Sequence, residues 1–202
     1  MTTQAETGTA RKIAYMTSLT EQSTSDLEGI GTVREDQYGQ RYRWIQNGGT
    51  AAAVVGAPEC FDETDVADSS FLGIGVGSAV ASGDKKYFAG IWLAAVAASS
   101  YGWILSRGVY ETARIALASG GAIVAGDLLT PGAATATTGT NSSKAYSFNV
   151  QFIQGITIVT GAGDVDALHD PHAIAMGAVT AGSDDATATV PSTAAVFVKG
   201  LL

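Results

Sequence analysis

The sequence predicts a mainly β protein: a small sandwich or barrel of short antiparallel strands, with an extended N-terminal arm and room for one short helix. The 202-residue chain is 46% hydrophobic but only 8% aromatic, and it contains 25 glycines. Its apolar share is mostly Ala, Val and Ile, which favours short strands and turns over long helices. Short β-branched runs separated by Gly, Pro, Thr and Asn clusters recur through the C-terminal half, a spacing typical of sandwiches and small barrels.

Residues 1–28 are predicted to form the arm. They are rich in Thr, Ser, Gln and Glu, and their isolated apolar anchors are Ile13, Tyr15, Met16 and Leu19. So few apolar side chains cannot offset the entropy lost when the backbone becomes ordered. We therefore expect the arm to become ordered by lying on a neighbour.

A β-hairpin is predicted within a region spanning 29–60. Residues 30–34 and 40–46 flank a polar turn, in which Gly39 supplies the positive φ that the turn requires. Strand alternation separates an aromatic face from a mostly charged one: Tyr42 and Trp44 share the first, and Arg41, Arg43 and Ile45 share the second. With Arg34 nearby, Arg41 and Arg43 form the only dense basic cluster, which we interpret as a solvated hairpin face.

The remaining residues, 61–202, are predicted to form a β-rich core domain, with 61–105 as a candidate insertion. Strands are expected within this domain at 114–117, 122–129, 156–159, 173–179 and 195–198, and before it at 51–55. The one tempting helix lies near residues 92–100, where alanine is dense. Residues 73–77 alternate glycine with apolar residues and predict a strand with close backbone approach, not a phosphate-binding loop.

Charge and targeting signals reduce the number of function classes that fit the sequence. Nineteen acidic against eleven basic residues give a net charge of -8, which disfavours binding to nucleic acid or anionic lipid. The most apolar stretch, 87–105, is interrupted by Ser99, Ser100 and Gly102, so we expect a buried core segment and no membrane partner. Residues 1–10 lack a secretory pattern, which indicates synthesis in the cytoplasm.

Catalytic chemistry has few candidates in this sequence. Cys60 is the sole cysteine, and there are only two histidines, so we expect no catalytic residue, no metal, no cofactor and no enzyme activity. His169 and His172, with Asp170 between them, could hold a metal for a hydrolase, but Pro171 favours an exposed turn. The acidic run at 62–68 is interpreted as a solvated loop because it lacks the pattern of a calcium site.

Two parts of the chain carry a resemblance to a known family. One is residues 31–36 (GTVRED) leading into 39–47 (GQRYRWIQN). The other is 125–129 (AGDLL), followed by 175–179 (AMGAV) and the ending 195–202 (AVFVKGLL). Together they resemble the decoration, or cement, proteins of tailed-bacteriophage heads.

That resemblance implies a structural virion protein on the capsid exterior, which binds the phage major capsid protein, stabilises the expanded head and assembles as a homo-oligomer, trimer or dimer. The candidate capsid contacts are Ile13, Tyr15, Met16, Leu19, Arg34, Arg41, Arg43 and Trp44. The alternative is a head-fibre base or tail-associated adhesin, in which Trp44, Trp92 and Trp103 could stack on sugars.

Overall fold

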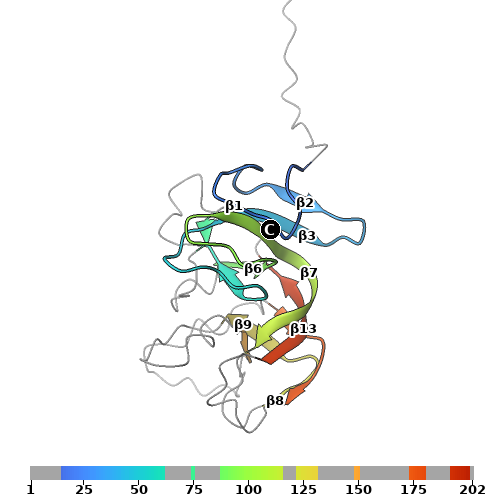
Figure 1. Cartoon of the computed structure of the whole chain (residues 1–202). Coiled ribbons are helices and arrows are strands. Elements are labelled where there is room, and N and C mark those ends of the chain that lie inside the picture. Colours follow the sequence, from blue (N-terminus) through green and yellow to red (C-terminus); the bar gives the residue numbers. More distant parts are fainter. Residues whose placement is uncertain are drawn as a thin grey trace, which may run out of the picture.

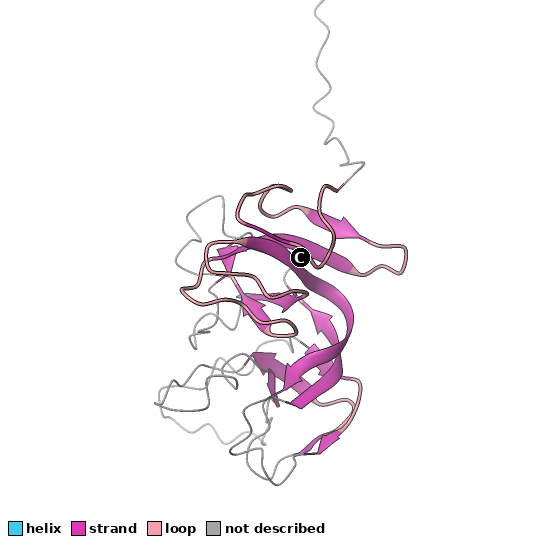
Figure 2. Cartoon of the chain, viewed as in Figure 1, coloured by secondary structure: helices cyan, strands magenta, loops and turns pink. Residues whose placement is uncertain are grey.

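The computed structural model describes residues 15–61, 74–75, 87–115, 122–131, 148–150, 173–180 and 192–200. Strands dominate these residues, and Figure 2 shows almost no helix among them. The strands are β1 (Gln22–Ser23), β2 (Val33–Glu35), β3 (Arg41–Asn47), β4 (Pro58–Cys60), β5 (Ile74–Gly75), β6 (Phe88–Trp92), β7 (Tyr101–Ile115), β8 (Ala122–Ile123), β9 (Leu128–Pro131), β10 (Phe148–Val150), β11 (Ala173–Ala175), β12 (Val179–Thr180) and β13 (Ser192–Lys199). The predicted mainly β fold is confirmed.

Strands β1 to β7, β9 to β11 and β13 belong to one 11-stranded open sheet, whose main path runs β10-β9-β11-β13-β7-β3-β2. Strands β8 and β12 form a separate two-stranded sheet. The 15-residue β7 is the longest strand and the centre of the large sheet (Figure 1). Strand β3 pairs with it along one edge, while β1, β6 and β13 follow one another along the other.

Two circuits of paired strands share β7. The first runs from β7 through β6, β4 and β5 to β3, with an isolated bridge between Phe61 and Gly75 joining β4 to β5. The second runs from β7 through β13, β11 and β9 to β10, which returns to β7 where Phe148 pairs with Ile115. A core cluster that includes Ile45, Phe61, Trp92 and Ile104 belongs to strands of the first circuit and to loops beside them.

The predicted hairpin is confirmed. Strand β2 pairs with β3 in the register Val33 with Arg43 and Glu35 with Arg41, and Gly39 has a φ of 78° in the turn. The predicted charged and solvated face of β3 is wrong at Arg43, which is only 5% exposed, with its guanidinium 5.8 Å from the centre of the Phe61 ring. Strand β3 is buried on both faces because it lies between two core clusters.

The helix expected near 92–100 is also wrong. Strand β6 ends at Trp92, and the chain then forms a loop in which Val96 exchanges two backbone hydrogen bonds with Ala53. The buried Asn47 side chain donates to the carbonyl of Val96 at 2.9 Å, and Ser99 has a φ of 58°. These bonds to distant parts of the chain outweigh the weak helical preference of alanine.

Most of the other strand predictions overlap observed strands, and two do not. Four of the predicted runs overlap observed strands: 114–117 overlaps β7, 122–129 overlaps β8 and β9, 173–179 overlaps β11 and β12, and 195–198 overlaps β13. Residues 51–55 contain only an isolated bridge at Ala53, and 156–159 lie outside the described residues. In the glycine-alternating segment, Ile74–Gly75 forms the predicted strand as β5, and a β-carbon on Gly75 would lie 2.8 Å from the carboxyl carbon of the Glu59 side chain.

The apolar stretch 87–105 forms β6, the following loop and the start of β7, whose side chains are mostly buried. Across the part of the chain that the structure describes, no helix has the length and apolar character needed to cross a membrane.

Candidate interaction surface

The first described residues, 15–28, pack on the sheet of their own chain, whereas the sequence predicted that they would lie on a neighbour. Strand β1 pairs with the beginning of β7, matching Gln22 with Gly102. The Trp103 indole N–H donates to the Thr17 hydroxyl at 2.8 Å, and both the Thr17 amide and its hydroxyl donate to Glu28 Oε1, at 2.7 and 2.8 Å. Thr17 and Glu28 are 4% and 5% exposed, so this polar chain is buried.

A second tryptophan holds the end of the same segment. The Trp44 indole N–H donates to Asp26 Oδ1 at 2.9 Å, and the Asp26 carboxylate also accepts the amides of Gly29 and Ile30. Because Trp44 is fully buried and Trp103 lies beside it, with ring centres 5.4 Å apart, the segment is fixed on a rigid aromatic base. Residues 15–28 are thus a cover over β3 and β7.

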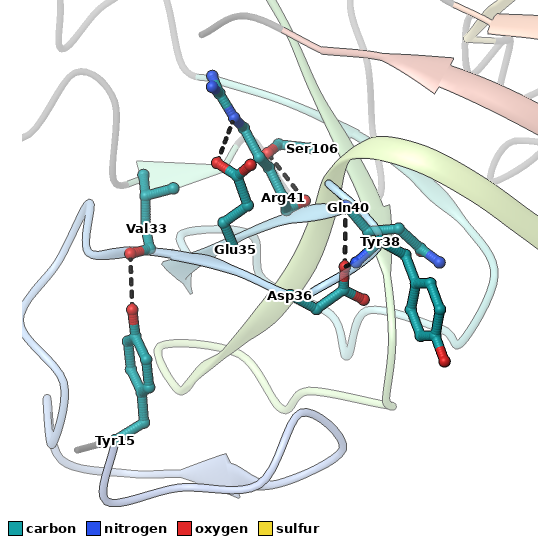
Figure 3. Close-up of polar contacts among 8 residues, drawn as sticks. All are labelled: Tyr15, Val33, Glu35, Asp36, Tyr38, Gln40, Arg41 and Ser106. Atoms are coloured by element: carbon teal, nitrogen blue, oxygen red, sulfur yellow. Dashed lines mark hydrogen bonds and ion pairs between the residues drawn. The ribbon is translucent and has the colours of Figure 1, made fainter. Parts of the chain in front are cut away.

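Tyr15 links this cover to the hairpin. Its hydroxyl donates to the Val33 carbonyl on β2 at 3.0 Å (Figure 3). Its ring meets the Trp103 ring edge-on at 5.7 Å, and the Arg34 guanidinium lies 5.1 Å from its centre. Leu19, another predicted contact, is partly buried against the same core. The Tyr15 hydroxyl therefore bonds to a backbone carbonyl that points outward from the edge strand β2. That carbonyl is then less available for pairing with another strand.

The candidate contacts Met16, Arg34 and Arg41 retain surface exposure. Met16 is 68% exposed, and Arg34 lies half-buried on β2. The Arg41 side chain is 38% exposed, and its Nε lies 3.1 Å from Glu35 Oε2 (Figure 3). These side chains can meet a partner without any change in the fold.

Two predicted contacts are corrected by their burial. Trp44 has no exposed surface and Arg43 is 5% exposed, so both support the fold instead of facing a partner. The sugar-stacking expectation for the tryptophans meets the same obstacle, because Trp92 and Trp103 are also almost fully buried. Ile13 lies outside the described residues.

Three exposed apolar residues near this surface were not predicted as contacts: Leu27, Val33 and Tyr38, which are 38%, 43% and 79% exposed. The sequence carried a partial signal for Val33, because strand alternation opposes its side chain to that of the neighbouring Arg34. Tyr38 lies at the tip of the hairpin, and a turn position gives no indication of whether an aromatic side chain will be covered.

Asp36 organises that hairpin turn. Its Oδ1 accepts the amides of Tyr38 and Gln40 at 2.9 and 3.0 Å, and its Oδ2 accepts the Tyr42 hydroxyl at 3.1 Å. Desolvation acts to raise the pKa of Asp36, but the hydrogen bonds from Gln40, Tyr38 and Tyr42 outweigh it and lower the pKa. Desolvation, followed by the hydrogen bond to Asp36, raises the pKa of Tyr42 to about 12.

Among the described residues, no group of three His, Cys, Asp or Glu side chains could hold a metal ion. His169, Asp170 and His172 lie outside these residues, as does the acidic run at 62–68. Cys60 is buried in the core cluster. The exposed or half-buried side chains around the cover and the hairpin are Met16, Leu27, Val33, Arg34, Tyr38 and Arg41.

Comparisons with protein-family models, with curated proteins and with solved structures find no match for this chain. Its function must therefore be argued from the resemblance of its sequence segments and from its own surface.

Proposed function

We propose that this chain is a structural virion protein that binds the outer surface of a tailed-phage capsid and stabilises the expanded head. The proposal starts from the resemblance of residues 31–47 and the C-terminal strands to decoration proteins. Its proposed partner is the phage major capsid protein, its proposed site of action is the capsid exterior, and it acts as a homo-oligomer without enzymatic activity.

The observation that carries the proposal is an exposed apolar set on a rigid support. Met16 and Leu27 belong to the cover formed by residues 15–28, and Val33 and Tyr38 belong to the adjoining hairpin. Four exposed apolar side chains within the cover and its adjoining hairpin favour a docking role for this part of the molecule. On the same hairpin, Arg34 adds a cation suited to a partner surface that carries carboxylates, while Arg41 is paired with Glu35.

Many copies on a symmetric shell would multiply weak contacts. Anchoring one part of an oligomer raises the effective concentration of its other binding sites, so each contact surface can be small. The buried bond between Thr17 and Glu28 and the part-buried bond between Trp44 and Asp26 keep the surface ordered before binding, which lowers the entropy cost of docking.

The test is co-sedimentation of the purified chain with expanded, undecorated heads and, separately, with unexpanded procapsids of the phage that encodes it. Saturable binding to expanded heads alone supports a maturation-dependent cement protein. Binding to neither particle contradicts the proposal and favours the head-fibre or tail-adhesin alternative.

Variants locate the surface within that assay. Met16→Asp and Tyr38→Ser should each weaken head binding by roughly tenfold if these side chains are buried at the contact. Val55→Ser is the matched control, since Val55 is 48% exposed in a loop outside both the cover and the hairpin. If all three variants bind equally well, the docking surface lies elsewhere.

A further inference from the structure

A second exposed apolar set lies on the outward face of the second strand circuit. There β7, β13, β11 and β9 each turn alternate side chains toward the core, and the intervening side chains face out. The registers match Val109 with Phe197, Phe197 with Ile174, and Ile174 with Leu128, so these four form one cross-strand row. Figure 1 shows β7 and β13 running side by side.

Three of the four side chains of this row are exposed, and Leu128 is half-buried. Val109, Ile174 and Phe197 are 39%, 39% and 37% exposed, and Met176, just beyond β11, is 52% exposed. A contiguous apolar strip across four strands is unusual on a monomer's surface and marks a contact face. Such a row on strands suits another sheet, because two sheets pack face to face through side chains of this kind.

Charges flank the row with opposite sign on its two sides. On one side, Arg107 pairs in register with Lys199, two residues before Val109 and two after Phe197. On the other side, Glu111 follows Val109 by two residues along β7, and both Arg107 and Glu111 are exposed.

We propose that this face, defined by Val109, Phe197, Ile174 and Leu128, binds the same face of a second copy about a two-fold axis. An isologous contact places each residue opposite the partner copy's residues across the axis. Rotation about an axis through the apolar row carries Arg107 of one copy over Glu111 of the other. The charge order along β7, cation then apolar then anion, is therefore self-complementary.

Other occupants fit the charges less well. An anionic lipid surface would be repelled by Glu111 and by the net charge of -8. Within one chain Arg107 and Glu111 are four strand residues apart, about 13 Å, so they do not neutralise each other directly. A second copy supplies both the apolar cover and the opposite charges, and this inference stands independently of capsid binding.

The test is the mass of the purified full chain by analytical ultracentrifugation over a wide concentration range. We expect a concentration-dependent dimer that Phe197→Ser weakens by roughly tenfold or more. Arg107→Glu should weaken it too, because the new carboxylate would face Glu111 of the other copy. The double variant Arg107→Glu with Glu111→Arg should restore the dimer, since both charges exchange and the pairing is regained. Val55→Ser is the control for loss of an exposed apolar side chain off this face.

Rescue by the double variant separates an interface effect from a folding effect, because each charge change alone alters the same strand. A monomer at all concentrations overturns the proposal, and so does a trimer, because a two-fold contact closes at two copies. A dimer that ignores Phe197→Ser and the charge changes overturns it as well. Capsid binding by a monomer would leave the proposed function standing while removing this inference.

Discussion

At the scale of single residues, the three tryptophans set the local structure around them. Each is buried, and each indole N–H donates to an oxygen far away in sequence: Trp44 to Asp26, Trp92 to Glu59 and Trp103 to Thr17. A buried indole N–H without a partner is costly, so these bonds select one position for the segments that carry the acceptors. The tryptophans thus hold the N-terminal cover and β4 in place.

Thr17→Val tests the buried network at its centre. The variant removes the acceptor of the Trp103 indole N–H and one of the donors to Glu28, so we expect a loss of about 1–3 kcal/mol in the free energy of unfolding. Urea denaturation followed by tryptophan fluorescence measures it. The exposed Thr20 provides the control, because Thr20→Val should leave the midpoint within error. Equal midpoints for the two variants would contradict the network.

Tyr42 makes stability depend on pH in the alkaline range. Its folded pKa of about 12 lies above the ordinary value of 10.0, so the folded state keeps a proton that the unfolded chain has lost between these values. This contribution is fully present below pH 10 and is lost as the pH rises toward 12. Across this pH window, the free energy of unfolding obtained from denaturation curves should therefore fall more steeply with pH for the wild type than for Tyr42→Phe. A parallel decline in both proteins would refute the assignment.

At the scale of elements, β7 determines the architecture. Its first half pairs with β3 on one edge and with β1 and β6 on the other, and its second half pairs with β13. No other described strand is long enough to serve both strand circuits. A substitution that disturbs the contact between β7 and a closely packed neighbouring strand should therefore destabilise the whole sheet and not one hairpin.

Gly90 on β6 marks such a close approach. It has a φ of 153°, and a β-carbon there would lie 2.9 Å from the Leu105 carbonyl carbon, closer than real contacts allow. Gly90→Ala should lower the free energy of unfolding by about 1–3 kcal/mol, because β6 must move away from β7. Gly177→Ala is the control, as a β-carbon at Gly177 meets nothing within 4 Å. Thermal unfolding by circular dichroism compares them, and equal melting temperatures would show that β6 tolerates the shift.

At the scale of the whole molecule, the N-terminal cover joins the fold to its proposed contact surface. Residues 15–28 contain three carboxylates and no Lys or Arg, whereas the hairpin below them carries Arg34 and Arg41. The cover is attached by Tyr15, Thr17, Glu28 and Asp26, so it belongs to the stability of the sheet as well as to the surface.

Two truncations separate these roles. Deleting residues 1–14 keeps Tyr15, Thr17, Asp26 and Glu28 and their described hydrogen bonds, so we expect the unfolding midpoint to stay close to that of the full chain. Deleting residues 1–28 uncovers Trp44 and Trp103, so we expect red-shifted tryptophan emission and a clearly lower midpoint. Only the shorter deletion can therefore test attachment to heads. A stable protein with unshifted emission after the longer deletion would show that the cover does not hold the sheet.

The candidate surface was predictable only in part. Met16, Arg34 and Arg41 were identified from the sequence and are exposed or half-buried on the surface. Arg43 and Trp44 lie on the same hairpin but are buried. A second core covers the face of Arg43, which strand alternation marked as solvated, and residues 15–28 cover Trp44. The cross-strand row through Phe197 could not be predicted, since it depends on the registers of four strands.

The sequence by itself determined the mainly β class, the hairpin with Gly39 in its turn and several C-terminal strands, because these follow from local composition and from the two-residue period of a strand. The tertiary structure alone decided the rest: the burial of Arg43, the loop at 92–100 and the packing of residues 15–28. Each depends on partners distant in sequence, such as Phe61, Asn47 and Trp103. Local preferences amount to fractions of a kcal/mol per residue, and pairing across a sheet readily overrides them.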